Sequence, residues 1–271
     1  MPIAARIVTD SNAMLPAELA TRFDILEVSL TIVVDGLARP EHEVDLPEFY
    51  DQLRSGKPIT TSAPSPGEIL ATYRRAVATG AESILCIHVG SNQSATTSAV
   101  RLAAREIDVP VEIVDTGTAS FIEGCCVWRA AELLATGAGR DEATQGATAV
   151  AAGARSVFTI GEISRATAGG RLAVHEGVGV PVFASTGPDM AELDRATSEA
   201  AAVANMAAEV ESHPGPLRVR IGHADASDAA DALERALRSL PNVAETIRYL
   251  VGPSVAAHTG AGTFGAVYHA I

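Results

Sequence analysis

Hydroxyl side chains gather in two polar segments of this chain. Thr61 and Ser62 come just before a proline-rich turn, and Ser94 and Thr96 lie in the segment 90–98. Hydroxyls and backbone N–H groups held in fixed positions can bind a carboxylate or a phosphate, especially where a helix begins. The pattern therefore indicates an anion-binding site, with local side-chain-to-backbone hydrogen bonding as the alternative.

Part of this polarity has a structural explanation. Ser65, Pro66 and Glu68 have the order of N-cap, N1 and N3 in a capping box, so they predict the start of a helix. That motif makes no use of the hydroxyls at positions 61 and 62. One serine of the segment 90–98 can cap the next helix, but the segment holds more hydroxyls than one cap requires.

Polar residues also follow the first predicted strand, where Asp10, Ser11 and Asn12 stand in succession. Ligands of open α/β sheets collect at the carboxyl ends of the strands, so these side chains are candidates for a binding site. The alternative is a turn or a helix N-cap, for which Asp, Ser and Asn are all well suited. Asp115 and Thr116 repeat this pattern after a later strand.

The segment 258–265, His-Thr-Gly-Ala-Gly-Thr-Phe-Gly, contains the spacing G-x-G-x-x-G. A dinucleotide site needs a preceding strand, a following helix and an acidic residue about 20 positions further on. Only six residues follow here, so we do not expect a dinucleotide site. We expect the glycines to bring the backbone close to a ligand head group beside His258. A structural role for a lone histidine is the alternative.

Arg171 follows two glycines and can pair with a carboxylate or a phosphate. The alternative is an ordinary surface arginine after a turn. Ser94, His258 and Asp10 can be combined on paper into a catalytic triad, but the sequence has no G-x-S-x-G elbow. We therefore favour an anion site made of hydroxyls, backbone N–H groups and a histidine.

The composition argues against several classes of partner. The formal net charge is −13 at pH 7 and aromatic residues make up 4%, which disfavours nucleic acid and anionic membrane surfaces. No apolar run approaches the roughly 18 residues of a membrane-spanning helix. The first residues lack the layout of a signal peptide. We therefore expect a cytoplasmic protein with no stable membrane insertion.

Metal, disulfide and P-loop chemistry have little support. Cys86, Cys125 and Cys126 are too few for a disulfide framework, and the adjacent pair fits buried positions in a helix. The seven histidines are scattered without a metal-binding spacing. Lys57, the only lysine, has no glycine-rich phosphate loop around it. We expect no metal and no cofactor.

Short β-branched runs alternate with Ala-, Leu- and Glu-rich stretches along the chain. Extended segments are predicted at 5–9, 25–34, 83–89 and 111–114, and helices at 16–22, 46–53, 68–77, 96–107, 120–136 and 140–154. This alternation predicts a parallel α/β sheet covered on both faces. Later strands at 157–160, 180–184, 217–223 and 245–251, with helices at 191–210 and 228–239, predict an α+β domain. The predicted domains are 1–154 and 155–271.

Six short motifs resemble, in the same order, those of the DegV family of fatty-acid-binding proteins. They are Ile7-Val8-Thr9-Asp10-Ser11 with Leu15-Pro16, Thr61-Ser62-Ala63-Pro64-Ser65-Pro66, Ser94-Ala95-Thr96, Asp115-Thr116 with Gly124, Gly169-Gly170-Arg171, and His258-Thr259-Gly260-Ala261-Gly262. Each motif alone is weak, but six in register over nearly the whole chain are specific. The resemblance implies two α/β domains that enclose a long-chain fatty acid in a tunnel between them.

The resemblance also implies how the fatty acid is held and used. Its carboxylate would lie on Thr61, Ser62 and Ser94, with His258 close by. The other motif residues expected to support the site are Asp10, Ser11, Thr96, Arg171, Thr259 and Gly260. Family members are not enzymes by themselves. Some present the bound fatty acid to a separate kinase subunit, which phosphorylates the carboxylate for phospholipid synthesis.

Several positions depart from the family pattern. Ala95, Thr97, Ala63 and Ala261 stand where the family has glycine, tyrosine, glutamine and proline, and the segment 180–182 lacks a family lysine. The hydroxyl ligands are intact, while the missing lysine bears on docking of the kinase subunit. Two other functions stay open: a stand-alone phosphotransferase or hydrolase acting on a small anionic substrate, and a regulatory binding module.

Overall fold

The structure is a computed structural model that describes residues 5–168, 177–186 and 189–271. The chain folds into two compact units. Unit 1 comprises Met1–Glu43 and Thr60–Ala152, and unit 2 comprises Val44–Ile59 and Gly153–Ile271. The last change of unit lies two residues before the expected domain boundary after residue 154. The segment 44–59, expected in the N-terminal domain, belongs to unit 2.

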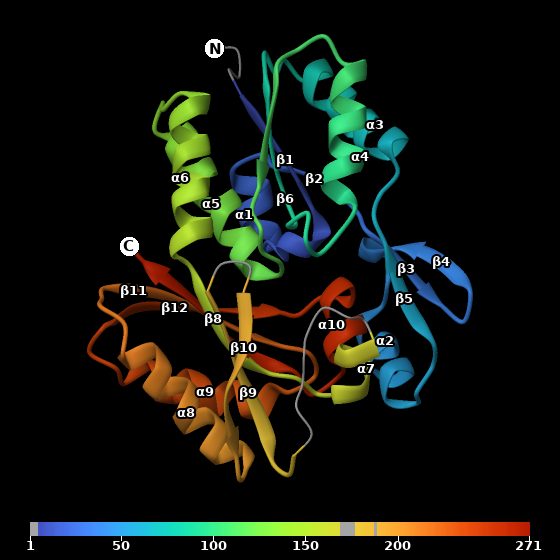
Figure 1. Cartoon of the computed structure of the whole chain (residues 1–271). Helices are drawn as coiled ribbons and strands as arrows, with labels where there is room; N and C mark the ends of the chain where they lie inside the picture. Colours follow the sequence, from blue (N-terminus) through green and yellow to red (C-terminus); the bar gives the residue numbers. More distant parts are fainter. Residues whose placement is uncertain (1–4, 169–176, 187–188) are drawn as a thin grey trace. The chain divides into compact units, whose positions relative to one another are not determined.

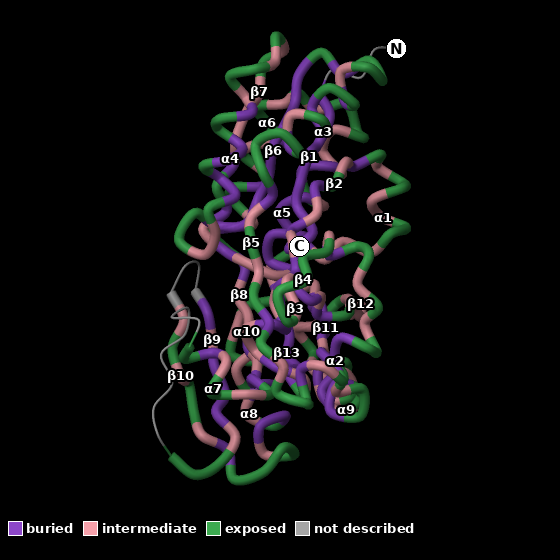
Figure 2. The backbone as a smooth tube through the Cα atoms, turned by 90° about the vertical axis from the view of Figure 1, so that its right-hand side faces the viewer, coloured by how far each residue is buried: buried purple, intermediate pink, exposed green. Residues whose placement is uncertain are grey.

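Unit 1 is built on a parallel four-stranded sheet with the order β2-β1-β6-β7. Its strands are β1 (Arg6–Asp10), β2 (Leu26–Val28), β6 (Ile84–His88) and β7 (Val111–Asp115). Every residue of β1 and β6 is buried, as Figure 2 shows. Such continuously buried strands are typical of parallel sheets covered on both faces, so the predicted parallel α/β architecture is confirmed.

Helices cover both faces of this sheet, as seen in Figure 1. Unit 1 contains α1 (Ala17–Arg22), α3 (Pro66–Ala78), α4 (Thr96–Ala103), α5 (Phe121–Ala135) and α6 (Arg140–Gly153), with short 3-10 turns at Ser11–Ala13, Glu41–Glu43 and Ala104–Glu106. On one face Tyr73 of α3 and Val100 of α4 pack against Val8. On the other face α5 and α6 pack against Ile7, and the predicted burial of Cys125 and Cys126 in α5 is confirmed.

A second, three-stranded sheet has the order β4-β3-β5, with β3 (Thr31–Val34), β4 (Leu37–Pro40) and β5 (Ile59–Ser62). β3 and β4 form an antiparallel hairpin whose two turn residues, Asp35 and Gly36, have φ angles of 50° and 81°. Two positive φ angles are what a type I′ turn requires, and Asp-Gly is a preferred sequence for it. β5 of this sheet carries Thr61 and Ser62, two of the hydroxyl residues singled out in the sequence.

Unit 2 contains a six-stranded sheet with the order β10-β9-β8-β13-β11-β12. The strands are β8 (Arg155–Thr159), β9 (Val180–Thr186), β10 (Asp189–Ala196), β11 (Leu217–His223), β12 (Val243–Leu250) and β13 (Phe264–Ala270). β11 and β12 pair in parallel, while the other described pairs are antiparallel. The predicted α+β character of the second domain is therefore confirmed.

The helices of unit 2 are α2 (Leu46–Arg54), α7 (Ile163–Ala168), α8 (Glu199–Glu211), α9 (Ser227–Arg238) and α10 (Pro253–Thr259). α8 and α9 lie on one face of the six-stranded sheet, where Met206 and Leu233 pack in one core with Val219. α2 is bound within unit 2 because Tyr50 Oη donates to the Val251 carbonyl at 2.9 Å.

The predicted helix over 191–210 is wrong in its first part. Residues 189–196 form β10, which pairs antiparallel with β9 along its length, and the helix begins only at Glu199. Ser198 marks the true start, since its side chain accepts the Ala201 N–H as an N-cap. Alanine favours a helix, but pairing with a neighbouring strand overrides that weak preference.

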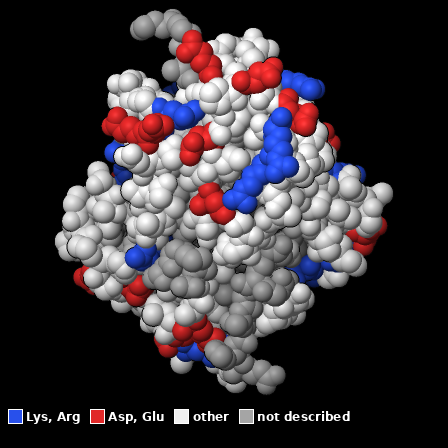
Figure 3. All heavy atoms as spheres, turned by 45° about the horizontal axis from the view of Figure 1, so that its top comes forward, with Lys and Arg blue, Asp and Glu red and all other residues white. Residues whose placement is uncertain are grey.

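Acidic and basic side chains lie beside one another on the face drawn in Figure 3. In the parts of the chain that the structure describes, no helix combines the length and apolar character needed to cross a bilayer. Within the same ranges, no group of three or more His, Cys, Asp or Glu side chains is arranged to hold a metal ion.

Candidate functional site

Asp10 lies at the carboxyl end of β1 and is fully buried. Its Oδ1 accepts the Asn12 N–H at 2.9 Å. This contact closes a turn after β1, which was the alternative to a binding site for these polar residues. Its Oδ2 accepts the Val89 N–H at 3.2 Å and lies 3.0 Å from Nδ1 of His88. Asp10 therefore joins the ends of β1 and β6, the neighbouring strands from which the polar loops leave.

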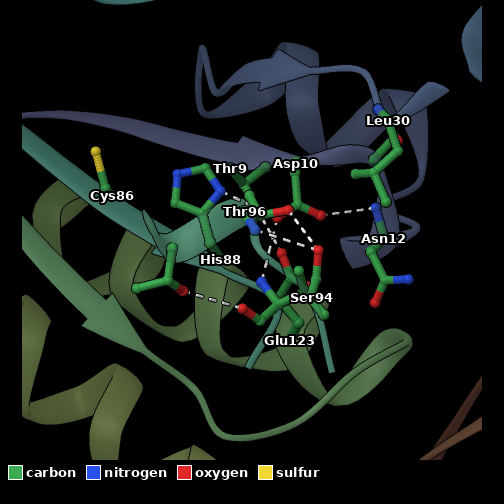
Figure 4. Close-up of polar contacts among 12 residues, drawn as sticks. Thr9, Asp10, Asn12, Leu30, Cys86, His88, Ser94, Thr96 and Glu123 are labelled. Atoms are coloured by element: carbon green, nitrogen blue, oxygen red, sulfur yellow. Dashed lines mark hydrogen bonds and ion pairs between the residues drawn. The ribbon is translucent and has the colours of Figure 1, made fainter. Parts of the chain in front are cut away.

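Figure 4 shows Asp10, His88, Ser94 and Thr96 gathered where β1 and β6 end. Thr96 is fully buried and Ser94 is half-buried. Ser94 Oγ accepts the Thr96 N–H at 3.2 Å and lies 2.8 Å from Thr96 Oγ1. When Thr96 donates through its hydroxyl as well, Ser94 keeps its own O–H proton for an anion.

Ser94 was also a candidate N-cap of the following helix, and it fills that role only in part. The N-cap of α4 is Ala95, which has no side-chain cap, and Ser94 satisfies the N–H of the first helical residue, Thr96. Ser91 is tied to the neighbouring strand instead, since its N–H donates to Asp115 Oδ1 at 3.0 Å.

Thr61 and Ser62 occupy the end of β5 in unit 1. Thr61 is half-buried and Ser62 is exposed. The residues that follow form the predicted capping box, since Ser65 Oγ accepts the Glu68 N–H at 3.3 Å and Glu68 Oε2 accepts the Ser65 N–H at 2.7 Å. The capping box leaves both preceding hydroxyl groups out, as predicted.

Ser11 has a structural role next to this site. Its hydroxyl donates to the carboxylate of the buried Glu41, and it accepts the Leu30 N–H at 2.9 Å. These contacts tie the end of β1 to the segments that enter and leave the three-stranded sheet. Ser11 therefore links the two sheets of unit 1.

Glu123 of α5 is a further buried carboxyl group close to the end of β1. It is fully buried, and Thr9 Oγ1 donates to its Oε1 at 3.1 Å. Burial raises the pKa of Glu123 well above its ordinary value, the negative charge of Asp10 raises it further, and the hydrogen bond from Thr9 opposes the rise. Glu123 thus stays protonated over a wider pH range than an exposed carboxyl group does.

The terminal glycine segment lies in unit 2, where α10 ends at Thr259. His258 and Thr259 are half-buried, and Thr259 accepts the Glu162 N–H through its carbonyl at 2.9 Å. A side chain at Gly260 would place its Cβ 2.6 Å from the Cβ of Glu162, and one at Gly161 would collide with the Ala261 carbonyl oxygen. The close approach that these glycines permit is to the loop around residues 161–162. This packing gives Gly161 and Gly260 a structural reason, and the expected approach of this backbone to a ligand head group stays a prediction.

Arg171 and the two glycines before it lie outside the described residues. Of the other predicted residues, Asp10, Ser94 and Thr96 come together at one end of the parallel sheet, with Ser11 linked to the same strand. His258, Thr259 and Gly260 belong to unit 2.

His88 and Glu123 were not predicted from the sequence, because their partners Asp10 and Thr9 are 78 and 114 residues away along the chain. The only available signal was a polar residue inside an otherwise apolar strand or helix. That signal shows that a partner is needed, but it does not identify the partner.

The chain matches known proteins over almost its whole length. The family model described as "Uncharacterised protein, DegV family" matches residues 4–270. A DegV domain-containing protein of Streptomyces coelicolor is 33% identical over 271 residues, which cover 96% of each chain.

Solved structures of DegV proteins have the same fold as this chain. A DegV family protein from Thermus thermophilus, described for its fatty acid binding, is 25% identical, with a TM-score of 0.90 over 100% of both chains. A DegV lipid-binding protein from Thermotoga maritima has a TM-score of 0.90 at 23% identity over 98% of both chains. With a family model that spans 4–270 and a full-length relative at 33% identity, this chain belongs to the DegV family.

Proposed function

We propose that this protein binds a long-chain fatty acid and holds its carboxylate on hydroxyl side chains. The observation that carries the proposal is the complete overlap with the Thermus thermophilus protein described for its fatty acid binding. The hydroxyl pair of Ser94 and Thr96 supports it, because that pair leaves a donor at the end of a parallel sheet. Thr61 and Ser62 on β5 complete the set of ligands proposed in unit 1, and a role for His258 rests on its sequence motif alone.

The tail and the head group of a bound fatty acid contribute differently to the free energy of binding. Burying a CH₂ group is worth about 0.8 kcal/mol, so roughly 14 methylenes supply on the order of 11 kcal/mol before binding costs are subtracted. A buried carboxylate without partners would cost several kcal/mol. The tail therefore drives binding, and the hydroxyls of Thr61 and Ser94 keep the head group from cancelling that gain.

The double variant Thr61→Ala with Ser94→Ala tests the ligand assignment. Hydrogen bonds to a charged group contribute about 1.5–3 kcal/mol each, so we expect the dissociation constant for palmitate to rise at least about tenfold. The measurement is equilibrium binding of palmitate to protein stripped of lipid, together with a thermal unfolding curve.

A matched control uses neighbouring hydroxyls that are exposed to solvent. Thr60 precedes Thr61 on β5, and Ser98 lies one turn after Ser94 at the start of α4; both are exposed. Thr60→Ala with Ser98→Ala should leave palmitate affinity within about twofold of the unchanged protein. Equal affinity of the test and control variants would show that the carboxylate is held elsewhere.

We also propose that the bound fatty acid is presented to a separate kinase subunit rather than modified by this chain alone. The chain has a single lysine, Lys57, and no P-loop sequence, which supports a carrier role. The purified protein should then show no turnover of ATP or of an acyl phosphate above a blank. Sustained turnover by the isolated chain would favour the stand-alone phosphotransferase or hydrolase instead.

A further inference from the structure

We infer that His88 and Asp10 form a buried pair that positions the loop carrying Ser94, so that His88 acts as a positioning residue for the anion site. The inference rests on the proposed function, since it assigns a role to residues behind the proposed carboxylate ligand. His88 lies outside the six sequence motifs of the family. It acts through the loop and not through contact with the fatty acid.

Asp10 is the anchor of this arrangement. Its carboxyl group is fully buried and accepts hydrogen bonds from the N–H groups of Asn12 and Val89, at 2.9 and 3.2 Å, and from Nδ1 of His88, at 3.0 Å. A buried carboxyl group needs such donors, and each donor is fixed in return. The Asn12 contact closes the turn after β1, and the contacts of His88 and Val89 place the start of the loop after β6 relative to β1.

The loop continues from this anchor to Ser94 through backbone hydrogen bonds. The N–H of Gly90 donates to the Thr118 carbonyl at 2.7 Å, and the N–H of Ser94 donates to the Gly90 carbonyl at 3.1 Å. A Cβ on Gly90 would lie 2.6 Å from the carbonyl carbon of Gly117. Gly90 is therefore held between Asp10's partner Val89 on one side and the loop after β7 on the other.

The main chain of His88 is fixed as well as its ring. Thr116 Oγ1 donates to the His88 carbonyl at 2.9 Å. The His88 ring is held separately, and within the described residues its hydrogen-bond partner is Asp10. Loss of the ring contact would free one oxygen of Asp10 from its second donor and loosen the hold on Val89.

The two ring nitrogens of His88 have different surroundings. Nδ1 faces Asp10, whereas Nε2 is buried and has no hydrogen-bond partner among the described residues. Because Asp10 accepts, Nδ1 carries the donated proton. A leucine would fill the same space without burying an unpaired nitrogen, so the hydrogen bond to Asp10 is what the histidine adds.

Because only Nδ1 of His88 has a partner, substitutions that keep or lose a donor at that position test its role. The amide nitrogen of asparagine reaches the position of Nδ1, and that of glutamine reaches the position of Nε2. His88→Asn should therefore keep palmitate affinity within about threefold of the unchanged protein, whereas His88→Gln and His88→Leu should raise the dissociation constant about tenfold. The measurements are palmitate binding and the thermal unfolding midpoint of the full chain.

Cys86 provides a matched control for a general loss of packing. It lies two residues before His88 on β6, is equally buried, and its Sγ contacts Tyr73 Oη at 3.0 Å instead of the loop. Cys86→Ala should lower the unfolding midpoint and leave palmitate affinity unchanged. A purely structural role for His88 predicts that all His88 variants follow the same relation between affinity and stability as Cys86→Ala.

The outcomes separate this inference from the proposed function. If the unchanged protein binds no palmitate, the proposed function fails. If it binds and His88→Leu binds equally well, or if His88→Asn is as weak as His88→Leu, the positioning role is overturned. Weak binding by His88→Leu and His88→Gln, with recovery in His88→Asn, supports it.

Discussion

Glu123 shows how the fold changes the chemistry of one residue. Its carboxyl group is fully buried on the α5 side of the parallel sheet, where it accepts a hydrogen bond from Thr9. Burial raises its pKa, and the negative charges of Asp10 and Glu27 add to the rise. The folded protein therefore favours a protonated Glu123 over a wider pH range than the unfolded chain does.

The pH dependence of unfolding tests this effect. A carboxyl group whose pKa is raised on folding contributes stability that is complete below its unfolded pKa and is lost as pH rises through its folded pKa. Glu123→Gln stays neutral and can still accept the hydrogen bond from Thr9. From pH 5 to pH 8 we expect this variant to gain stability over the unchanged protein, by up to about 1.4 kcal/mol per pH unit.

Urea unfolding at pH 5, 6, 7 and 8 measures that difference directly. A difference that stays constant over this range would mean that Glu123 titrates alike in the folded and unfolded states. Asp141→Asn is a suitable control because Asp141 is exposed at the start of α6.

Local turn chemistry made several site residues predictable. Asp10, Ser94 and Thr96 were identified because polar residues after a strand are visible in the sequence alone. His88 was not, because a histidine within a buried strand gives no indication of which residue pairs with it. Its partner becomes apparent only once β1 and β6 are placed side by side.

At the scale of elements, the terminal glycines belong to the packing of α10 and β13 in unit 2. Gly260 has a φ of 83° and lies against Glu162, and the N–H of Gly262 donates to the Ala224 carbonyl at 2.7 Å. Thr263 Oγ1 donates within the same turn, to the Gly260 carbonyl at 2.8 Å. The turn is thus fixed by neighbours within its own unit.

Gly260→Ala tests whether this packing explains the glycine. The new Cβ meets both an unfavourable φ and the Glu162 side chain, so we expect a loss of about 2 kcal/mol or more in unfolding free energy. Gly153→Ala is the control, since nothing lies within 4 Å of its Cβ position. It should change stability by no more than about 0.5 kcal/mol. Equal stability of the two variants would contradict the packing explanation.

The prediction over 191–210 failed because local preference was taken as decisive. The sequence after Asp189 is rich in residues that favour a helix, yet it pairs with β9 and carries an irregularity in register between Glu192 and Asp194. Only Ser198, as an N-cap, marks the change of element locally. Strand pairing of this kind depends on residues that a local pattern does not contain.

At the scale of the whole molecule, the chain changes unit three times, after Glu43, after Ile59 and after Ala152. The last change was predictable because the strand–helix alternation stops there. The assignment of the segment 44–59, which contains α2, to unit 2 was not predictable. An amphipathic helix shows that one of its faces is buried, but it does not show which part of the chain covers that face. Arg165 of unit 2 binds the C-terminal end of α2, since it donates to the carbonyls of Leu53 and Lys57 at 3.0 and 3.3 Å.

Fatty-acid carriage by this member of the DegV family has one most direct test. The full chain is purified gently, extracted with solvent, and the released lipid is identified by mass spectrometry. We predict a long-chain fatty acid in near-stoichiometric amount, and uptake of palmitate once the protein has been stripped. Protein that yields no fatty acid and takes up no palmitate would contradict the proposed function.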